Sequence, residues 1–237
     1  MVRRVVDDFE RMWADLAPVG RAPASGGYFR HPFMSAEREL AGWFAEQAAA
    51  RGLPVETDAY GNQVAWWDPP AGSATDEMAP GEASQGPHRR SGAGRSGAGR
   101  SGALLTGSHL DSVLDGGAYD GPLGVVSALA AIDLMRERGV VPARPVGVSV
   151  FVEEEGSRFG LACLGSRLAA GAMTWESARE LADRDGVRLG DVVAGDTTSI
   201  FPPTGEGDGE RWIWSQRGRH WNKNDGSVSL VNDAGRK

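Results

Sequence analysis

The strand–helix–strand pattern of residues 103–152 restricts the fold of this 237-residue chain more than any other feature. Apolar runs at 103–107 and 145–152 flank a segment with helical spacing, for which Pro122 suits the first turn and Gly139 suits the end. A strand, a helix and a second strand in this order favour a parallel strand pair with a right-handed crossover. We therefore expect an α/β fold with a mostly parallel sheet and helices on both faces.

A helix and two short strands are expected ahead of this unit. Ser35 can cap the helix, Glu37 is favourable in its first turn, and Gly52 suits its left-handed end. Leu53–Thr57 and Gln63–Trp67 predict two strands joined by a turn. The apolar face of the helix is expected to consist of Leu40, Trp43, Phe44 and Ala48.

The composition divides the chain into four parts. Residues 1–67 and 103–200 carry the patterns of a folded α/β domain, whereas 68–102 consist mainly of Pro, Gly, Ser, Ala and Arg with a repeated Arg-Ser-Gly-Ala-Gly. We expect 68–102 to be a flexible insertion, because it lacks the interleaved aromatic residues of the alternative, a nucleic-acid-binding arm. Residues 201–237 show no sustained period and are expected to form an irregular tail.

The charge and the scarcity of cysteine and histidine exclude several classes of protein. A formal net charge of −7 argues against a chain that coats nucleic acid. No apolar run approaches the ~20 residues that span a membrane, and the N-terminus is too polar for a signal peptide, so we expect a cytoplasmic protein. The single Cys163 excludes a disulfide framework and a thiolate zinc cluster. With four histidines in the chain, carboxylates must supply most ligands of any metal site.

Ionisable side chains follow both strands of the 103–152 unit. His109 and Asp111 follow the first strand, Glu153–Glu155 follow the second, and Asp120 lies at the start of the connecting helix. Ligands bind at the carboxyl ends of strands in open α/β sheets, and one imidazole with several carboxylates suits zinc or manganese. A packed histidine, a solvated acidic face and a helix cap are the ordinary alternatives for these residues taken singly.

Three segments of this region, residues 107–124, 151–160 and 165–167, resemble the M20-type dinuclear-metal amidohydrolases. The branch that they resemble contains allantoate amidohydrolase and N-carbamoyl-L-amino acid hydrolase. Residues 60–67 are also similar to that branch and favour its allantoate side. The resemblance covers most of residues 9–190 apart from the repeat tract, and it implies a metallo-aminopeptidase-like catalytic domain.

The resemblance implies two divalent metal ions, zinc or manganese, and a role for each site residue. His109 would bind one ion, Asp120 would bridge both, and Glu155 would bind the second. Glu154 would be the general base that acts on the bridging water, and Asp111 would hold the His109 ring in the correct tautomer.

The sequence also departs from the family pattern. Two further histidine ligands that the family places later in the chain do not occur here. The resemblance stops after Ile200, so we expect the smaller lid and dimerisation domain of the family to be missing. We therefore expect the chain to be a truncated N-terminal part of such an enzyme, one that can hold fewer than two metal ions. The homodimer of the family would then lack its usual interface.

Two functions follow from these patterns. The first is a metal-dependent hydrolase of linear ureido or amide C–N bonds, with allantoate preferred and N-carbamoyl-L-amino acids second. The second is a catalytically incomplete fragment of such an enzyme that binds metal weakly without turnover. A peptidase of the same superfamily is a third alternative, but the run Glu-Glu-Glu-Gly-Ser-Arg-Phe is nearer to the ureido branch. The expected partner is a small ureido substrate, not a nucleic acid or a membrane.

Overall fold

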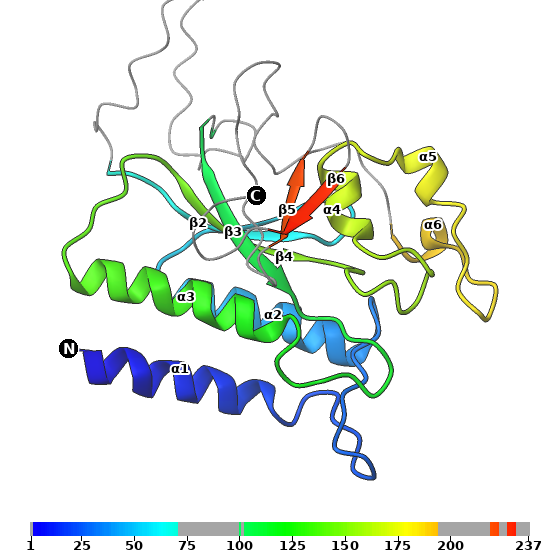
Figure 1. The fold of residues 1–237 in the computed structure, drawn as a ribbon, viewed down its shortest axis with the longest axis horizontal. Helices are drawn as coiled ribbons and strands as arrows, with labels where there is room; N and C mark the ends of the chain where they lie inside the picture. The colour runs from blue at the N-terminus through cyan, green and yellow to red at the C-terminus, as the bar shows by residue number, and fades with distance from the viewer. Residues whose placement is uncertain (1, 71–99, 101, 194–218, 223–226, 231–237) are drawn as a thin grey trace, which may run out of the picture.

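The computed structural model describes residues 2–70, 100, 102–193, 219–222 and 227–230. Its main body is a four-stranded sheet with long helices packed beneath it (Figure 1). Along the chain the elements are α1 (Val2–Leu16), α2 (Ser35–Ala50), β1 (Val55–Thr57), β2 (Gln63–Trp67), β3 (Leu104–His109), α3 (Pro122–Glu137), β4 (Val146–Phe151), α4 (Leu164–Ala169), α5 (Trp175–Ala178) and α6 (Leu189–Val192).

The sheet has the strand order β1-β2-β4-β3 and confirms the α/β class. Strands β3 and β4 are parallel, as the strand–helix–strand pattern predicts. Strand β2 is antiparallel to both β1 and β4, so the described sheet is mixed rather than mostly parallel. The reason is local for the β1–β2 pair: the five-residue connection Asp58–Asn62 is too short for a crossover and can join only antiparallel neighbours.

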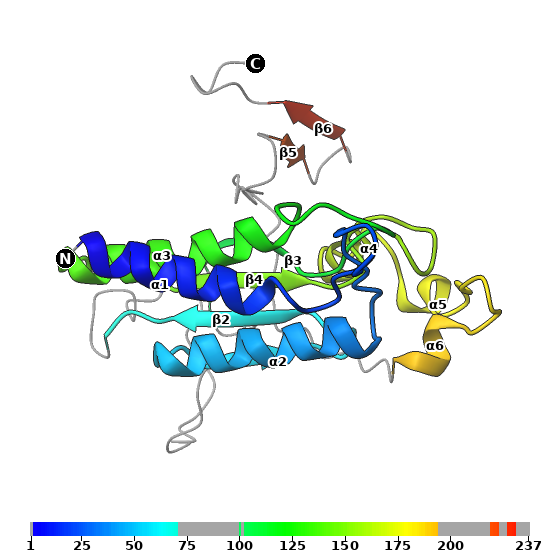
Figure 2. The same cartoon turned by 90° about the horizontal axis from the view of Figure 1, so that it is seen from below.

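The sheet has an apolar core on each face. Alternate residues of β2 point in opposite directions, so Ala65 and Trp67 pack with α1, α2 and α3, whereas Trp66 packs on the other face. Ala169 of α4 contacts this second cluster, which places helices on both faces as expected. Figure 2 shows the molecule from the side of α1, α2 and α3, the three long helices that pack on one face of the sheet. The larger cluster includes Leu40, Phe44, Ala48, Val125, Val126, Leu129, Ile132, Val148 and Val150.

Helix α1 is not among the elements expected from the sequence, although its pattern is visible there. Val5, Met12 and Leu16 recur at helical spacing and are almost completely buried. Helix α2 begins at Ser35 as expected, but Ser35 does not cap it, because Met34 occupies the cap position and makes no side-chain bond. The carboxylate of Glu37 instead accepts the backbone N–H of Phe33 at 3.0 Å.

Arg100, in the stretch expected to be a flexible insertion, has a buried side chain. Its guanidinium donates to Asp68 at 2.8 and 2.9 Å and to Glu56 at 2.7 Å, and it lies over the ring of Trp66. Residues 71–99 and 101 lie outside the described part, so the rest of that expectation is untested. Arg100 therefore anchors the chain where β3 is about to begin.

In the stretch 201–237, expected to be irregular, the described residues form two short strands. These are β5 (Arg219–Asn222) and β6 (Ser227–Leu230), which pair antiparallel. Among the described residues, no helix has both the length and the apolar character needed to cross a membrane.

Candidate metal centre

The parallel pairing of β3 and β4 places their carboxyl ends side by side, with His109 opposite Phe151 in the register. His109 is the last residue of β3, and its side chain is fully buried. Gly121 lies directly against the ring, because a Cβ at this position would be 2.6 Å from the His109 Cε1 atom. The start of α3 thus closes over the imidazole, and only glycine leaves enough room for it.

Carboxylates gather around the Nε2 atom of His109. Glu154 Oε2 lies 3.3 Å away, and Asp120 Oδ1 lies 4.0 Å away. Ligand atoms of His109, Glu154 and Glu155 all lie within 4.8 Å of one another, a spacing that can hold one metal ion. Asp120 is at the rim, with a side chain 44 % exposed. The structure thus brings four of the five expected site residues, His109, Asp120, Glu154 and Glu155, into one cluster.

The fifth residue, Asp111, lies on the other side of the ring and is completely buried. His109 Nδ1 is 3.0 Å from the backbone carbonyl oxygen of Asp111 and 3.4 Å from its Oδ1 atom. Both carboxylate oxygens of Asp111 also accept backbone N–H groups, from Glu154 at 3.3 Å and from Glu155 at 3.1 Å. These acceptors favour a proton on Nδ1, which leaves Nε2 directed at the other carboxylates.

The electrostatics of this cluster favour a cation. Burial alone lowers the pKa of His109, but the hydrogen bond and charge of Asp111 and the charges of Glu154 and Glu155 raise it to about 9. Burial raises the pKa of Glu155, and the negative charges of Asp120 and Glu154 raise it further. The positive charge of His109 lowers it. The carboxylates therefore hold positive charge on a buried ring, and a divalent ion supplies the same charge more effectively. The residues present fit a metal ion.

Glu153, the first of the three consecutive glutamates, faces away from the cluster. Its backbone is left-handed, with φ of +52°, and its buried Oε1 accepts the N–H groups of Arg158 and Phe159 at 3.0 and 2.7 Å. Burial raises the pKa of Glu153 to about 7. The sequence does not show that Glu153 differs in role from Glu154 and Glu155, because the three residues are identical. The direction of each side chain depends on the backbone turn.

Asn62 is a site-supporting residue that the sequence pattern assigned only to a turn. Its fully buried amide donates to Asp58 Oδ2 at 2.7 Å and to the Gly165 carbonyl at 3.0 Å. Its carbonyl oxygen accepts the N–H of Val152 at 3.1 Å. Asn62 thus fixes the chain immediately before the three glutamates and connects it to α4.

Cys163 precedes α4 and contacts Glu154 through both backbone and side chain. Its N–H donates to the Glu154 carbonyl at 2.7 Å, and its Sγ atom lies 3.6 Å from Glu154 Oε1. Burial and the charge of Glu154 raise the pKa of the Cys163 thiol to about 11. A neutral thiol is a hydrogen-bond donor and a poor nucleophile, so Cys163 is not suited to be the attacking group.

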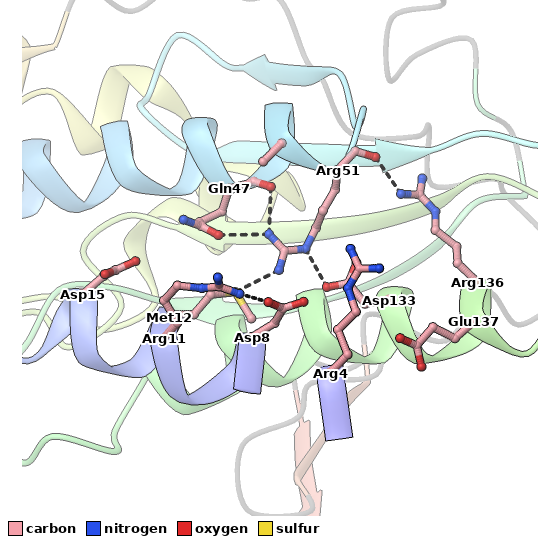
Figure 3. Close-up of a pocket in the computed structure, with 11 residues that line it drawn as sticks. Arg4, Asp8, Arg11, Met12, Asp15, Gln47, Arg51, Asp133, Arg136 and Glu137 are labelled. Atoms are coloured by element: carbon pink, nitrogen blue, oxygen red, sulfur yellow. Dashed lines mark hydrogen bonds and ion pairs between the residues drawn. The ribbon is translucent and has the colours of Figure 1, made fainter. Parts of the chain in front are cut away.

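A cavity of about 480 Å³ lies elsewhere, among α1, α2 and α3 (Figure 3). Arg51 crosses it and donates to Asp133 at 2.9 Å and to Gln47 at 2.9 and 3.0 Å. Arg136 and Glu137, at the end of α3 far from Asp120, also line it, whereas no residue of the metal cluster does. This cavity is therefore a gap between helices bridged by ion pairs, and it is separate from the candidate metal centre.

Comparisons with known proteins show which enzymes this chain is similar to. The chain is 34 % identical over 187 residues to an N-carbamoyl-L-amino acid amidohydrolase of Geobacillus stearothermophilus, covering 78 % of this chain and 39 % of that protein. It is 38 % identical over 86 residues to an allantoate amidohydrolase of Bacillus subtilis, covering 36 % and 21 %. A hydantoinase/carbamoylase family amidase from Burkholderia ambifaria superposes with a TM-score of 0.63 at 28 % identity, covering 78 % and 39 %.

These relatives confirm the resemblance to the allantoate and N-carbamoyl-L-amino acid branch, and the chain spans less than half the length of each. A family model described as peptidase family M28 matches residues 93–212. The sequence motifs had suggested an M20-type protein. That match covers 120 of the 237 residues and includes His109, Asp120 and Glu155. The chain therefore belongs to peptidase family M28.

Proposed function

We propose that the chain carries the metal-binding part of an amidohydrolase centre that cleaves C–N bonds of linear ureido compounds. Allantoate is the preferred substrate and N-carbamoyl-L-amino acids are the second. The observation that carries this proposal is the meeting of His109, Glu154 and Glu155 at the carboxyl ends of two parallel strands. The names of the relatives support the substrate class.

His109, Asp120 and Glu155 are the residues that would hold zinc or manganese. When bound, such an ion supplies Lewis acidity, which makes water a nucleophile near neutral pH and stabilises negative charge on the ureido carbonyl oxygen. The neighbouring carboxylates balance the charge of the ion, and Asp111 keeps the ring turned toward it. The resemblance implies two ions, whereas the grouping in the structure fits one.

Glu154 is the general base and then the general acid. Its Oε2 atom faces the Nε2 side of His109, so it is the oxygen placed to take a proton from the attacking water. The water oxygen bonds to the ureido carbon, the C–N bond breaks, and the proton passes from Oε2 to the departing nitrogen. One carboxylate therefore serves both steps.

Metal binding without turnover is the second candidate function. His109 is the only histidine in the cluster among the described residues, whereas the ring of His31 contacts the ring of Phe29 in a tilted arrangement with centroids 4.2 Å apart. One imidazole with carboxylates binds a divalent ion more weakly than a site with several imidazoles, and it leaves fewer groups to orient a substrate.

An assay of ammonia release distinguishes the hydrolase from the chain that binds metal without turnover. The purified 237-residue chain is incubated with Mn²⁺ or Zn²⁺ and with allantoate or N-carbamoyl-L-amino acids. Turnover that disappears in Glu154→Gln, and persists in the exposed control Glu39→Gln, supports the hydrolase. Metal bound by elemental analysis without ammonia release supports the second function. Absence of bound metal contradicts both, and release of amino acids from dipeptides instead would favour a peptidase.

A further inference from the structure

The two carboxylate oxygens of Glu154 have different neighbours. Oε2 lies 3.3 Å from His109 Nε2, on the side of the metal cluster. Oε1 lies 3.6 Å from the Sγ atom of Cys163, within hydrogen-bond range for a sulfur donor. The chain has a single cysteine, and it lies against the residue to which we assign the proton transfer.

The backbone fixes the position of this thiol. Cys163 has a left-handed φ of +61°, and its N–H donates to the Glu154 carbonyl at 2.7 Å. The next two N–H groups, of Leu164 and Gly165, donate to the carbonyls of Glu153 and Val152 at 3.1 and 3.0 Å. Three consecutive bonds thus attach the start of α4 to the chain that carries Glu154, so the backbone of Cys163 cannot move independently of that chain.

A glutamate in this position needs a second contact to be held in one orientation. The terminal torsion of a glutamate side chain is broad, because the carboxylate plane rotates with little energy cost. A contact on Oε2 alone opposes this rotation with one interaction, and a donor on Oε1 adds a second that holds the carboxylate plane more tightly. Precise orientation matters for proton transfer, because the acceptor oxygen must lie within hydrogen-bond reach of the water.

We propose that Cys163 is a positioning residue for Glu154, and that its thiol donates a hydrogen bond to Oε1 that keeps Oε2 turned toward the metal cluster. This inference rests on the proposed role of Glu154 in the hydrolase. Cys163 acts through Glu154 and is not a metal ligand, because its sulfur is outside the group of mutually close ligand atoms found among the described residues.

The S–H stretching vibration tests the bond directly and needs no turnover. This infrared band lies apart from other protein bands, and here it has one source, since Cys163 is the only cysteine. We expect the band at lower wavenumber in the wild-type chain than in Glu154→Ala and in the larger, apolar Glu154→Leu, which both remove the acceptor. Ser166→Ala is the matched control, because the Ser166 hydroxyl donates to the Cys163 carbonyl rather than to Glu154.

Kinetics test the consequence for the reaction. Cys163→Ala removes the donor, and alanine must adopt the same left-handed backbone as cysteine. We therefore expect kcat to fall about three- to tenfold, the effect of one hydrogen bond, while KM stays constant. Cys163→Ser should restore part of the loss, because a hydroxyl also donates. A merely structural role would instead change thermal stability and give no rescue by serine.

Two results would overturn the proposal. One is an S–H band at the same position in the wild-type chain and both Glu154 variants. The other is loss of that band when Mn²⁺ is added, which would make the sulfur a metal ligand. Absence of ammonia release from the wild-type chain contradicts the proposed function instead, and the infrared comparison still decides the bond between Cys163 and Glu154.

Discussion

The carboxylate of Asp111 accepts the backbone N–H of Glu155 at 3.1 Å, which ties the segment after β3 to the segment after β4. Its other oxygen accepts the N–H of Glu154 at 3.3 Å, and its backbone carbonyl lies 3.0 Å from His109 Nδ1. One buried residue therefore sets the relative positions of an imidazole and two carboxylates. The spacing of the metal cluster depends on Asp111, although Asp111 lies at the Nδ1 side of the His109 ring and Glu154 lies at the Nε2 side.

Replacing Asp111 by asparagine should weaken metal binding. An asparagine amide has one acceptor oxygen, so its NH2 group must face one of the two backbone N–H donors and push that glutamate away. Loss of such a supporting group typically costs about 10–100-fold in metal affinity. Titration with Mn²⁺ by calorimetry measures this loss. Asp115→Asn, in the same loop but paired with Ser25, is the control and should bind like the wild-type chain.

Gly121→Ala should displace His109. A Cβ at Gly121 would lie 2.6 Å from both the Cε1 and the backbone oxygen of His109, and its φ of +91° disfavours any L side chain. We expect lower metal affinity together with a lower melting temperature. Gly117→Ala provides a comparison within the same loop, since nothing lies within 4 Å of a Cβ there. Equal metal affinity in the two variants would show that the start of α3 does not constrain the ring.

Arg100→Lys should destabilise the fold. The buried guanidinium donates twice to Asp68 and once to Glu56 and covers Trp66, a geometry that a lysine ammonium cannot reproduce. We expect the free energy of unfolding to fall by about 1–3 kcal/mol, as measured by urea denaturation. The exposed pair of Arg188 and Glu180 provides the control, and Arg188→Ala should cost no more than about 0.5 kcal/mol.

Glu37 should make stability depend on pH. Burial raises its pKa to about 7, with the charge of Asp111 adding to this and the Phe33 N–H and Arg38 opposing it. An acid with a higher pKa in the folded chain stabilises the fold fully below its unfolded pKa, ~4.5, and loses that contribution as the pH rises through 7.

Glu37→Gln is neutral at every pH and can still accept the Phe33 N–H. It should therefore be more stable than the wild-type chain at pH 8 and of similar stability at pH 4.5. Thermal unfolding at both pH values checks this prediction. A constant difference between the two chains across the range would mean that Glu37 titrates normally.

The parts of the fold and site that depend on neighbouring residues in the sequence could be predicted. Pro122 begins α3 and Gly139 follows it with φ of +72°, because proline and glycine act through their own backbone. The gathering of His109 and Glu155 also followed from sequence, since His109 ends one strand of a parallel pair and Glu155 lies shortly after the end of the other. The position of a residue at a strand end is a local property.

The rest depends on contacts between segments far apart in the chain. Nothing in the sequence shows that Asp111 binds the backbone of Glu155, 44 residues later, or that the thiol of Cys163 turns toward Glu154. Helix α1 was missed for a related reason: its apolar stripe is clear, but whether it packs depends on α3, which lies more than 100 residues further on.

Asn62 has a consequence for how small a working version of this centre can be. The parallel unit from β3 to α4 contains every proposed metal ligand, but it is not sufficient as a minimal module. Without Asn62, the N–H of Val152 and the carbonyl of Gly165 would each lose a buried partner directly behind the three glutamates. The antiparallel hairpin of β1 and β2 is therefore an integral part of the centre, and the unit that carries the chemistry must begin before β3.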